Sequence, residues 1–154
     1  MILIDGKKIA SQIQKDFFDF VNSLTDRKPC LAVILVGNNP ASEIYISKKT
    51  KACEEIGIKS KKICLHEEIS EEQLLQQIDS LNKNPEIDGI LVQLPLPTHI
   101  NPTIITIGIS PEKDVDGLHP INLGKLSLEH DTTGFVPCTP LGIKVLLEKY
   151  NIDT

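Results

Sequence analysis

The chain has 154 residues, of which 40% are hydrophobic and 24% are charged, and its formal net charge is −5. This composition is typical of one globular domain and excludes a disordered chain, while the acidic balance argues against nucleic acid or an anionic membrane as a partner. We find no signal-peptide pattern and no apolar run of about 18 residues, so we expect a cytoplasmic protein. Four cysteines without metal-type spacing lie in or beside apolar segments and are expected to be buried free thiols: Cys30, Cys53, Cys64 and Cys138.

The first third of the chain alternates between helical and strand patterns. Residues 7–24 carry apolar side chains at helical spacing, which predicts an amphipathic helix packed on a larger body through Ile9, Ile13, Phe17, Phe20 and Leu24. Residues 30–37 form a continuous apolar, β-branched run, the pattern of a strand buried on both faces and hence of a parallel sheet. A helix is predicted directly afterwards over 40–56, with Asn39 as N-cap and Pro40 at its first position.

The alternation continues towards the end of the chain. We predict a weaker strand over 59–65, a helix capped by Ser70 and ending near residue 84, and a buried strand over 90–94. This order defines an α/β fold, a three-layer α/β/α domain on a small, mainly parallel sheet like the N-terminal domain of amino-acid dehydrogenases.

Two helices and one long loop complete the predicted domain, which covers residues 1–150. A short helix is predicted over 102–107, and residues 110–140 show few periodic signals, so they are expected to form a long functional loop. Thr139 and Pro140 cap a last helix that ends at Tyr150, giving a segment 139–150 that leads towards a missing second domain.

One lysine stands among the apolar positions of the helix over 40–56. At 100° per residue, Lys49 falls in the middle of a face formed by Ala52, Tyr45, Ile56, Cys53 and Ile46. The helix begins at the carboxyl end of a strand, where α/β sheets bind ligands, and helical side chains lean towards the N-terminus. Partial burial would disfavour the charged form of Lys49 and make it available for proton transfer, although ordinary snorkelling explains the position equally well.

Two later polar residues point to the same sheet edge. Gln93 is the polar side chain within the strand over 90–94, so it is either a structural amide or a site residue. The loop Asp114–Gly117 is either a plain turn or brings a carboxylate to the site. Residues 36–40 do not match a dinucleotide fingerprint, since Pro40 lacks an amide that a phosphate needs. The four histidines lack ligand spacing, so no metal is expected.

Four motifs together resemble the family of bifunctional methylenetetrahydrofolate dehydrogenase/methenyltetrahydrofolate cyclohydrolases. They occur in the family's order and cover nearly the whole chain: Ala41-Ser42-x-x-Tyr45-x-x-x-Lys49-x-Lys51, Val92-Gln93-Leu94-Pro95-Leu96-Pro97, Pro111-x-Lys113-Asp114-Val115-Asp116-Gly117 and Pro137-Cys138-Thr139-Pro140. The resemblance implies the N-terminal folate-binding catalytic domain of an enzyme of one-carbon metabolism. That enzyme oxidises 5,10-methylenetetrahydrofolate with NADP⁺ and hydrolyses the methenyl product to 10-formyltetrahydrofolate.

The resemblance also implies a role for individual residues. Lys49 matches the catalytic lysine, Gln93 the glutamine that holds it, Tyr45 the tyrosine that lines the folate site, and Asp116 the carboxylate that grips the pterin. Backbone contacts to the substrate are implied for Val92 and Leu94.

The remaining implications concern the parts that this chain lacks. The family's NADP-binding Rossmann domain has no counterpart in the sequence, so we expect no dehydrogenase activity from these 154 residues alone. Tetrahydrofolate derivatives are the implied partners, and the complete protein is implied to be a homodimer. The alternative is an isolated folate-binding or interaction module that ends at Thr154.

Overall fold

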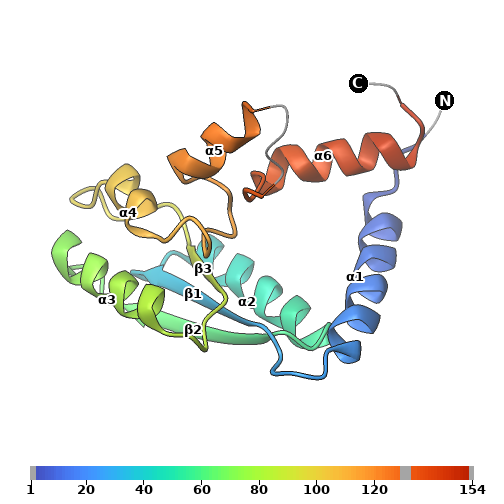
Figure 1. The fold of residues 1–154 in the computed structure, drawn as a ribbon. Coiled ribbons are helices and arrows are strands. Elements are labelled where there is room, and N and C mark those ends of the chain that lie inside the picture. Colours follow the sequence, from blue (N-terminus) through green and yellow to red (C-terminus); the bar gives the residue numbers. More distant parts are fainter. Residues whose placement is uncertain (1–2, 129–132, 153–154) are drawn as a thin grey trace.

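The computed structural model describes residues 3–128 and 133–152. Helices and strands alternate along the chain as an α/β fold requires (Figure 1). The elements are α1 (Gly6–Ser23), β1 (Cys30–Val36), α2 (Pro40–Glu55), β2 (Lys59–Leu65), α3 (Glu71–Lys83), β3 (Gly89–Val92), α4 (Pro102–Gly108), α5 (Pro120–Leu126) and α6 (Cys138–Lys149).

The sheet has three parallel strands in the order β2-β1-β3. Strand β1 lies in the middle, and its residue Ile34 faces Ile63 of β2 on one side and Val92 of β3 on the other. Residues 32–36 of β1 are all buried, as expected for a continuous β-branched run covered on both faces. The predicted mainly parallel sheet is therefore confirmed.

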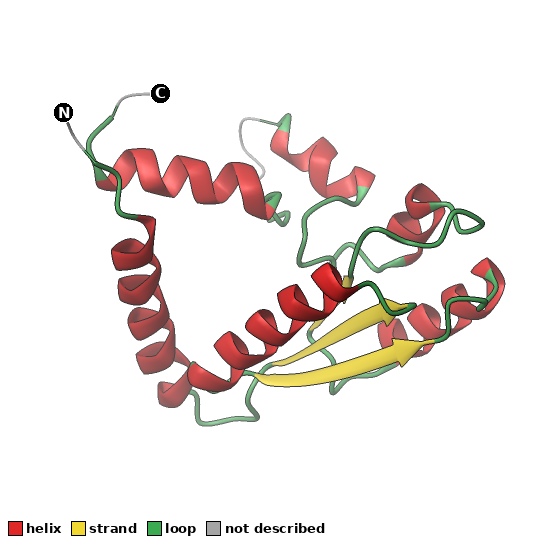
Figure 2. Cartoon of the chain, turned by 180° about the vertical axis from the view of Figure 1, so that it is seen from behind, coloured by secondary structure: helices red, strands yellow, loops and turns green. Residues whose placement is uncertain are grey.

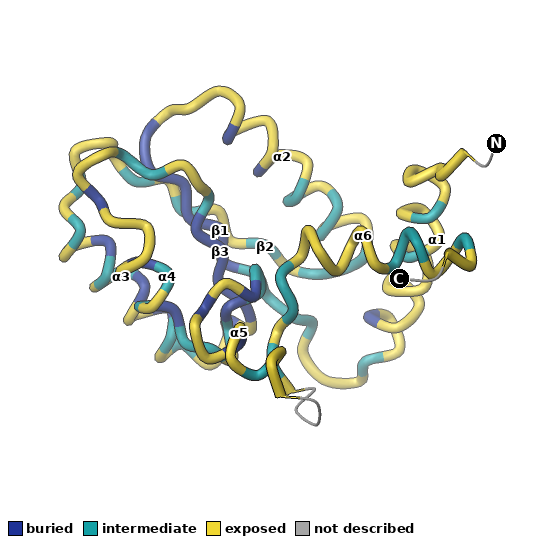
Figure 3. Tube along the Cα trace, turned by 90° about the horizontal axis from the view of Figure 1, so that it is seen from above, coloured by how far each residue is buried: buried dark blue, intermediate teal, exposed yellow. Residues whose placement is uncertain are grey.

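Helices cover both faces of this sheet (Figure 2). On one face, Ile46 of α2 packs against Val33, Leu35 and Leu91. On the other face, helices α3 and α4 build the larger cluster of apolar side chains, which includes Ala32, Ile34, Leu74, Ile78, Leu81, Ile90, Ile100 and Ile105. Most of the buried residues in Figure 3 lie in these three layers, so the predicted α/β/α architecture is correct.

Helices α1 and α6 lie beside the layers and are largely exposed (Figure 3). Val21 is the one buried residue of α1, whereas Phe17 and Phe20 are 51% and 59% exposed. The prediction that the face of α1 packs on a large body is therefore wrong for the described chain, because α1 contacts α6 instead of lying across the sheet. Where the N-terminus of α1 meets the C-terminus of α6, the amide of Asp5 donates to the Tyr150 hydroxyl at 2.8 Å.

The segment over residues 110–140 contains a helix that the sequence pattern did not predict. Helix α5 is as short as α4, but its N-cap is His119, whereas α4 begins after Asn101, a usual N-cap residue. The start of α5 therefore lacked a recognisable signal apart from Pro120. Helix α6 begins at Cys138, ahead of the predicted start, and its N-cap residue Pro137 supplies no side-chain hydrogen bond. Strand β3 ends at Val92, two residues before the predicted end.

The cysteines differ from the expectation of buried thiols. Cys30 and Cys53 are half-buried, whereas Cys64 and Cys138 are exposed, and all four are free. Cys64 is exposed because it lies on β2, an edge strand with one open side. No helix in the described residues is long and apolar enough to span a membrane.

Gly89 opens β3 at a point where a side chain has no room, which gives a test of the packing. A Cβ at this position would overlap Cγ1 of Val115 and lie 3.3 Å from Cδ1 of Leu31. We expect Gly89→Ala to lower the free energy of unfolding by about 1–3 kcal/mol, measured by urea denaturation. The control is Gly142→Ala in α6, where nothing lies within 4 Å of the new carbon. Equal stability of Gly89→Ala and the unmodified chain would contradict this packing.

Candidate active site

The candidate site lies where β1 and β3 end. These neighbouring strands run in parallel. The connection that follows β1 and the connection that follows β2 lie on opposite faces of the sheet. In an open α/β fold of this kind, ligands usually bind at the carboxyl ends of the strands between the two connections. Helix α2 begins there, immediately after Gly37. The Asn39 side chain accepts hydrogen bonds from the amides of Ala41 and Ser42 at 3.0 and 3.1 Å, and Pro40 fills the first helical position.

Lys49 reaches this edge from the second half of α2 and is only half-buried. Its Nζ donates to Oε1 of Gln93 at 3.5 Å and lies 4.8 Å from the centre of the Tyr45 ring, within the range of a cation–π contact. Tyr45 is 58% exposed, so the apolar face of α2 is not wholly buried, whereas Ile46 beside it is fully buried. The face of α2 is thus divided between a core residue and two residues of the site.

Gln93 follows β3 and bonds to neighbouring backbone through its amide groups, while its side-chain oxygen faces Lys49. Its backbone amide donates to the carbonyl of Ile34 at 2.9 Å and so extends the pairing of β3 with β1. Its side-chain Nε2 donates to the carbonyl of Leu94 at 2.7 Å, which directs Oε1 towards Lys49. Val92 is buried, while Leu94 is 43% exposed and precedes a cis peptide bond to Pro95.

The loop that carries Asp116 runs beside β3. Ile90 forms a parallel bridge with Asp114, and the amide of Gly117 closes a turn on the Asp114 carbonyl at 3.1 Å. Asp116 stands in this turn and is half-buried. Burial raises the pKa of the Asp116 carboxyl; the positive charge of Lys49 opposes this rise, and the negative charge of Asp114 adds to it.

Cys138 also belongs to this neighbourhood, although its sequence position suggested only a buried thiol. Its Sγ donates to the carbonyl of Val115 at 3.3 Å. The residue as a whole is exposed, but partial loss of water around its sulfur and the nearby Asp116 carboxylate raise the pKa of the Cys138 thiol against the opposing charge of Lys49, so the thiol stays protonated as a donor. The signal that pointed here was the motif Pro137–Pro140, which follows the Asp116 loop in the sequence.

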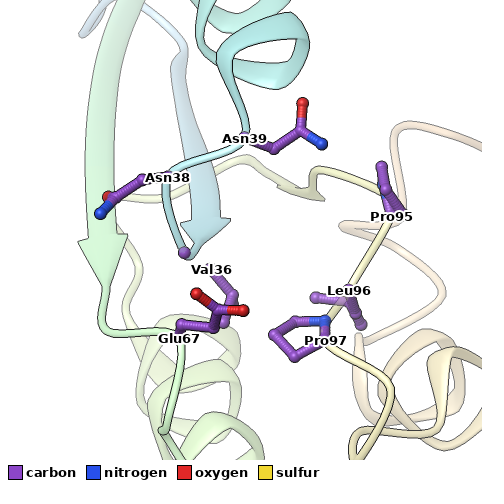
Figure 4. A pocket seen from close by; sticks show the side chains of 8 residues that line it. Val36, Asn38, Asn39, Glu67, Pro95, Leu96 and Pro97 are labelled. Carbon is purple, nitrogen blue, oxygen red and sulfur yellow. The ribbon is translucent and has the colours of Figure 1, made fainter.

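Two cavities lie near the segment that follows β3, and Lys49, Gln93 and Tyr45 line neither of them. Leu94 and Asp116 line a narrow cavity of about 20 Å³. Residues 95–97 line a more open cavity of about 320 Å³, together with residues 36–39 and Glu67 (Figure 4). Glu67 is the one ionisable residue in the lining of the open cavity, and Lys49, Gln93 and Asp116 do not contribute to it.

Metal ligands do not gather among the described residues. No group of three or more histidine, cysteine, aspartate or glutamate side chains in residues 3–128 and 133–152 has the placement of a metal site. His119 instead caps α5 by accepting the amide of Ile121 at 3.0 Å, and His130 lies outside the described residues.

A lysine, a glutamine and a half-buried aspartate beyond the ends of parallel strands define an enzyme-type α/β domain, and comparison with known proteins identifies its family. The protein-family model described as tetrahydrofolate dehydrogenase/cyclohydrolase, catalytic domain, matches residues 4–116 of the sequence. The chain belongs to this family.

Similar proteins agree with that assignment. The chain is 54% identical over 155 aligned residues to the bifunctional protein FolD of Aquifex aeolicus, covering 99% of this chain and 53% of that relative. A crystal structure of the Campylobacter jejuni FolD dehydrogenase/cyclohydrolase superposes with a TM-score of 0.92 at 49% identity, covering 99% of this chain and 55% of that one. The Trypanosoma brucei enzyme, solved with NADP cofactor and inhibitor, gives a TM-score of 0.92 at 32% identity, covering 98% and 52%. The chain spans about half the length of the curated relatives it matches.

The raised pKa of Asp116 leads to a prediction about stability. A carboxyl group whose pKa is higher in the folded than in the unfolded state destabilises the fold as the pH rises through the folded pKa. We therefore expect Asp116→Asn to be more stable than the unmodified chain at pH 7, and the difference to vanish below the unfolded pKa of about 3.9. Urea denaturation across this pH range measures the effect, with Asp19→Asn, an exposed carboxylate on α1, as the control. A difference that grows as the pH falls would overturn the prediction.

Proposed function

We propose that this chain is the catalytic domain of a methylenetetrahydrofolate dehydrogenase/methenyltetrahydrofolate cyclohydrolase, and that it forms the folate-binding side of the active site. The observation that carries the proposal is the Lys49 amine held between the Gln93 side-chain oxygen and the Tyr45 ring, within the electrostatic influence of Asp116. Membership of the family and the similarity to FolD proteins along nearly the whole chain support it. The substrates are tetrahydrofolate derivatives that carry one carbon unit.

Binding of the substrate is assigned to residues around Lys49. Asp116 accepts hydrogen bonds from the pterin, which carries several N–H donors, and a half-buried carboxylate does this in an environment with little competing water. The exposed ring of Tyr45 offers an aromatic face for the flat part of the folate. The main chain at Val92 and Leu94 supplies further contacts, and the Leu94 carbonyl keeps one lone pair after accepting the Gln93 amide.

Lys49 is proposed to act in the hydrolysis. A water oxygen forms a bond to the cationic methenyl carbon while one of its protons passes to the amine of Lys49. The bond from that carbon to one of its two nitrogens then breaks. This nitrogen keeps the electron pair and takes up the remaining proton of the hydroxyl group, which leaves a formyl group on the other nitrogen. In this proposal Lys49 acts as the base of the step and the water supplies the proton that it takes up. Gln93 positions this amine through its side-chain oxygen.

The oxidation uses NADP⁺ as hydride acceptor, and the residues described here do not fit that cofactor. At the start of α2, Asn39 already occupies the amides of Ala41 and Ser42, and Pro40 has none to offer. At the start of α3, the amide of Gln73 is bonded to Ser70 and two acidic residues follow the cap. We therefore place the NADP site in the half of the relatives that this chain does not match.

The role of Lys49 predicts a loss of hydrolysis without a loss of fold. Lys49→Arg retains the positive charge but removes the base, because a guanidinium does not deprotonate in proteins. The assay uses the protein translated from the complete reading frame. We expect its rate of 5,10-methenyltetrahydrofolate hydrolysis to fall by at least about 100-fold, with an unchanged unfolding transition. The matched control is Lys48→Arg, the exposed neighbour on α2, which should retain the full rate. Full hydrolysis by a folded Lys49→Arg variant would end the proposal for this residue.

The absence of a fit for NADP gives a second expected outcome. Residues 1–154 alone, mixed with 5,10-methylenetetrahydrofolate and NADP⁺, should form no methenyl product above the rate without protein, as followed by its absorbance. The protein translated from the complete reading frame is the comparison. Formation of the methenyl product by residues 1–154 would refute the placement of the cofactor site. An inactive product of the complete reading frame that still binds tetrahydrofolate would favour the alternative, a folate-binding module.

A further inference from the structure

The carboxylate of Asp116 is placed by its surroundings and not by bonds of its own. Within the part of the chain that the structure describes, no hydrogen bond reaches its side chain, and the residue stands in a turn outside regular structure. A pterin contact needs this carboxylate at a fixed position, since misplacement by about 1 Å weakens such sites strongly. Whatever holds the turn therefore decides how well Asp116 works.

A buried amide on α5 connects the segments on either side of the turn. Asn122 is 1% exposed, and its Nδ2 donates to the carbonyl of Pro111 at 2.9 Å and to Oδ2 of Asp114 at 3.0 Å. Its Oδ1 accepts the backbone amide of Phe135 at 3.4 Å. One side chain thus uses both donors and its acceptor to join the loop before Asp116, helix α5 and the segment that leads to α6.

The carboxylate of Asp114 is the centre of this arrangement. It is 1% exposed, and the same oxygen that receives Asn122 also accepts the amide of His119 at 2.8 Å. A buried carboxylate needs such hydrogen-bond donors, and removal of one donor leaves the carboxylate with fewer bonds to stabilise it. Asp114 lies two residues before Asp116, so a shift of its carboxylate moves the turn.

The segment before α6 closes on the turn from the other side. Gly117 has a φ of +68°, and a Cβ there would lie 2.6 Å from the carbonyl carbon of Val136 and 2.7 Å from the nitrogen of Pro137. The Cys138 thiol adds a bond to the Val115 carbonyl at 3.3 Å. Asn122 holds Phe135, the residue that begins this segment, and so keeps the close contact in place.

We propose that Asn122 is a positioning residue for Asp116: it fixes the turn that presents this carboxylate to the pterin by joining Pro111, Asp114 and Phe135 in one buried hydrogen-bonded unit. Asn122 itself touches neither substrate nor Lys49 and acts through Asp116. The inference rests on the proposed function, because it assumes that Asp116 binds the folate. It assigns a role in substrate affinity to a residue that lies outside the candidate site.

The test is a double-mutant cycle on the protein translated from the complete reading frame. Calorimetry measures the dissociation constant for tetrahydrofolate, the probe, in each variant. Asn122→Ala should raise the dissociation constant by about tenfold, because it removes a bond to a buried charge. In an Asp116→Asn background the same change should have less than about a twofold effect, since neighbours that act on one group are not additive. The hydrolysis kcat should stay within about threefold of the original, because Lys49 and Gln93 keep their contact.

The control is Asn82, a partly buried asparagine whose side chain bridges two backbone groups. Asn82 donates to the carbonyl of Gly108 at 2.8 Å and accepts the amide of Ser110 at 2.9 Å, so Asn82→Ala removes comparable bonds without touching Asp114. This variant should lose stability and keep its affinity for tetrahydrofolate. If Asn122→Ala does not fold, Asn122→Ser, which retains one hydroxyl donor, takes its place.

The outcomes separate the two proposals. An unmodified protein that does not bind tetrahydrofolate refutes the proposed function. If it binds, and Asp116→Asn weakens binding, two results overturn only the role of Asn122: an unchanged affinity of Asn122→Ala, or an effect of Asn122→Ala that is equally large in the Asp116→Asn background.

Discussion

The pairing of β1 with a parallel strand on each side is the constraint on which the rest of this structure depends. Residues 32–36 of β1 are buried on both faces, so helices must cover the sheet above and below. Because β2 and β3 flank β1, the connections α2 and α3 lie on opposite faces, and the ends of β1 and β3 open between them. Lys49 from α2 and Gln93 after β3 meet at this opening, although they are 44 residues apart in the chain.

In the motif from Pro111 to Gly117, some residues anchor the loop to the core and another is available for the ligand. Lys113 donates to the carbonyls of Leu81 and Asn84 at 3.1 and 2.8 Å, where unpaired carbonyls at the end of α3 attract a positive charge. Val115 occupies the space that Gly89 leaves open. These residues anchor the loop to the core, and Asp116 is the residue of this loop that we propose to face the ligand.

Local signals in the sequence predicted the elements, and long-range contacts explain what they did not predict. The apolar run that begins at Cys30 identified β1, and Ser70 with Gln73 forms the capping box that opens α3. Helix α5 was not predicted because its N-cap is a histidine, whereas the equally short α4 begins after Asn101, a usual N-cap residue. The exposure of Tyr45 and the partners of Asn122 depend on segments that only the fold brings together, so spacing along one helix does not reveal them.

The bond between the Gln93 side chain and the Leu94 carbonyl also governs how the lysine carries its proton. With Nε2 committed to that carbonyl, the amide presents only its oxygen to Lys49. An ammonium donates to this oxygen, and so does a neutral amine, which retains two N–H groups after one proton has left. The lysine is therefore held in the same place in both of its protonation states, and in the neutral state its lone pair points away from Gln93. A carboxylate at position 93 would place a negative charge beside Lys49, whereas the amide holds the lysine side chain through an uncharged oxygen.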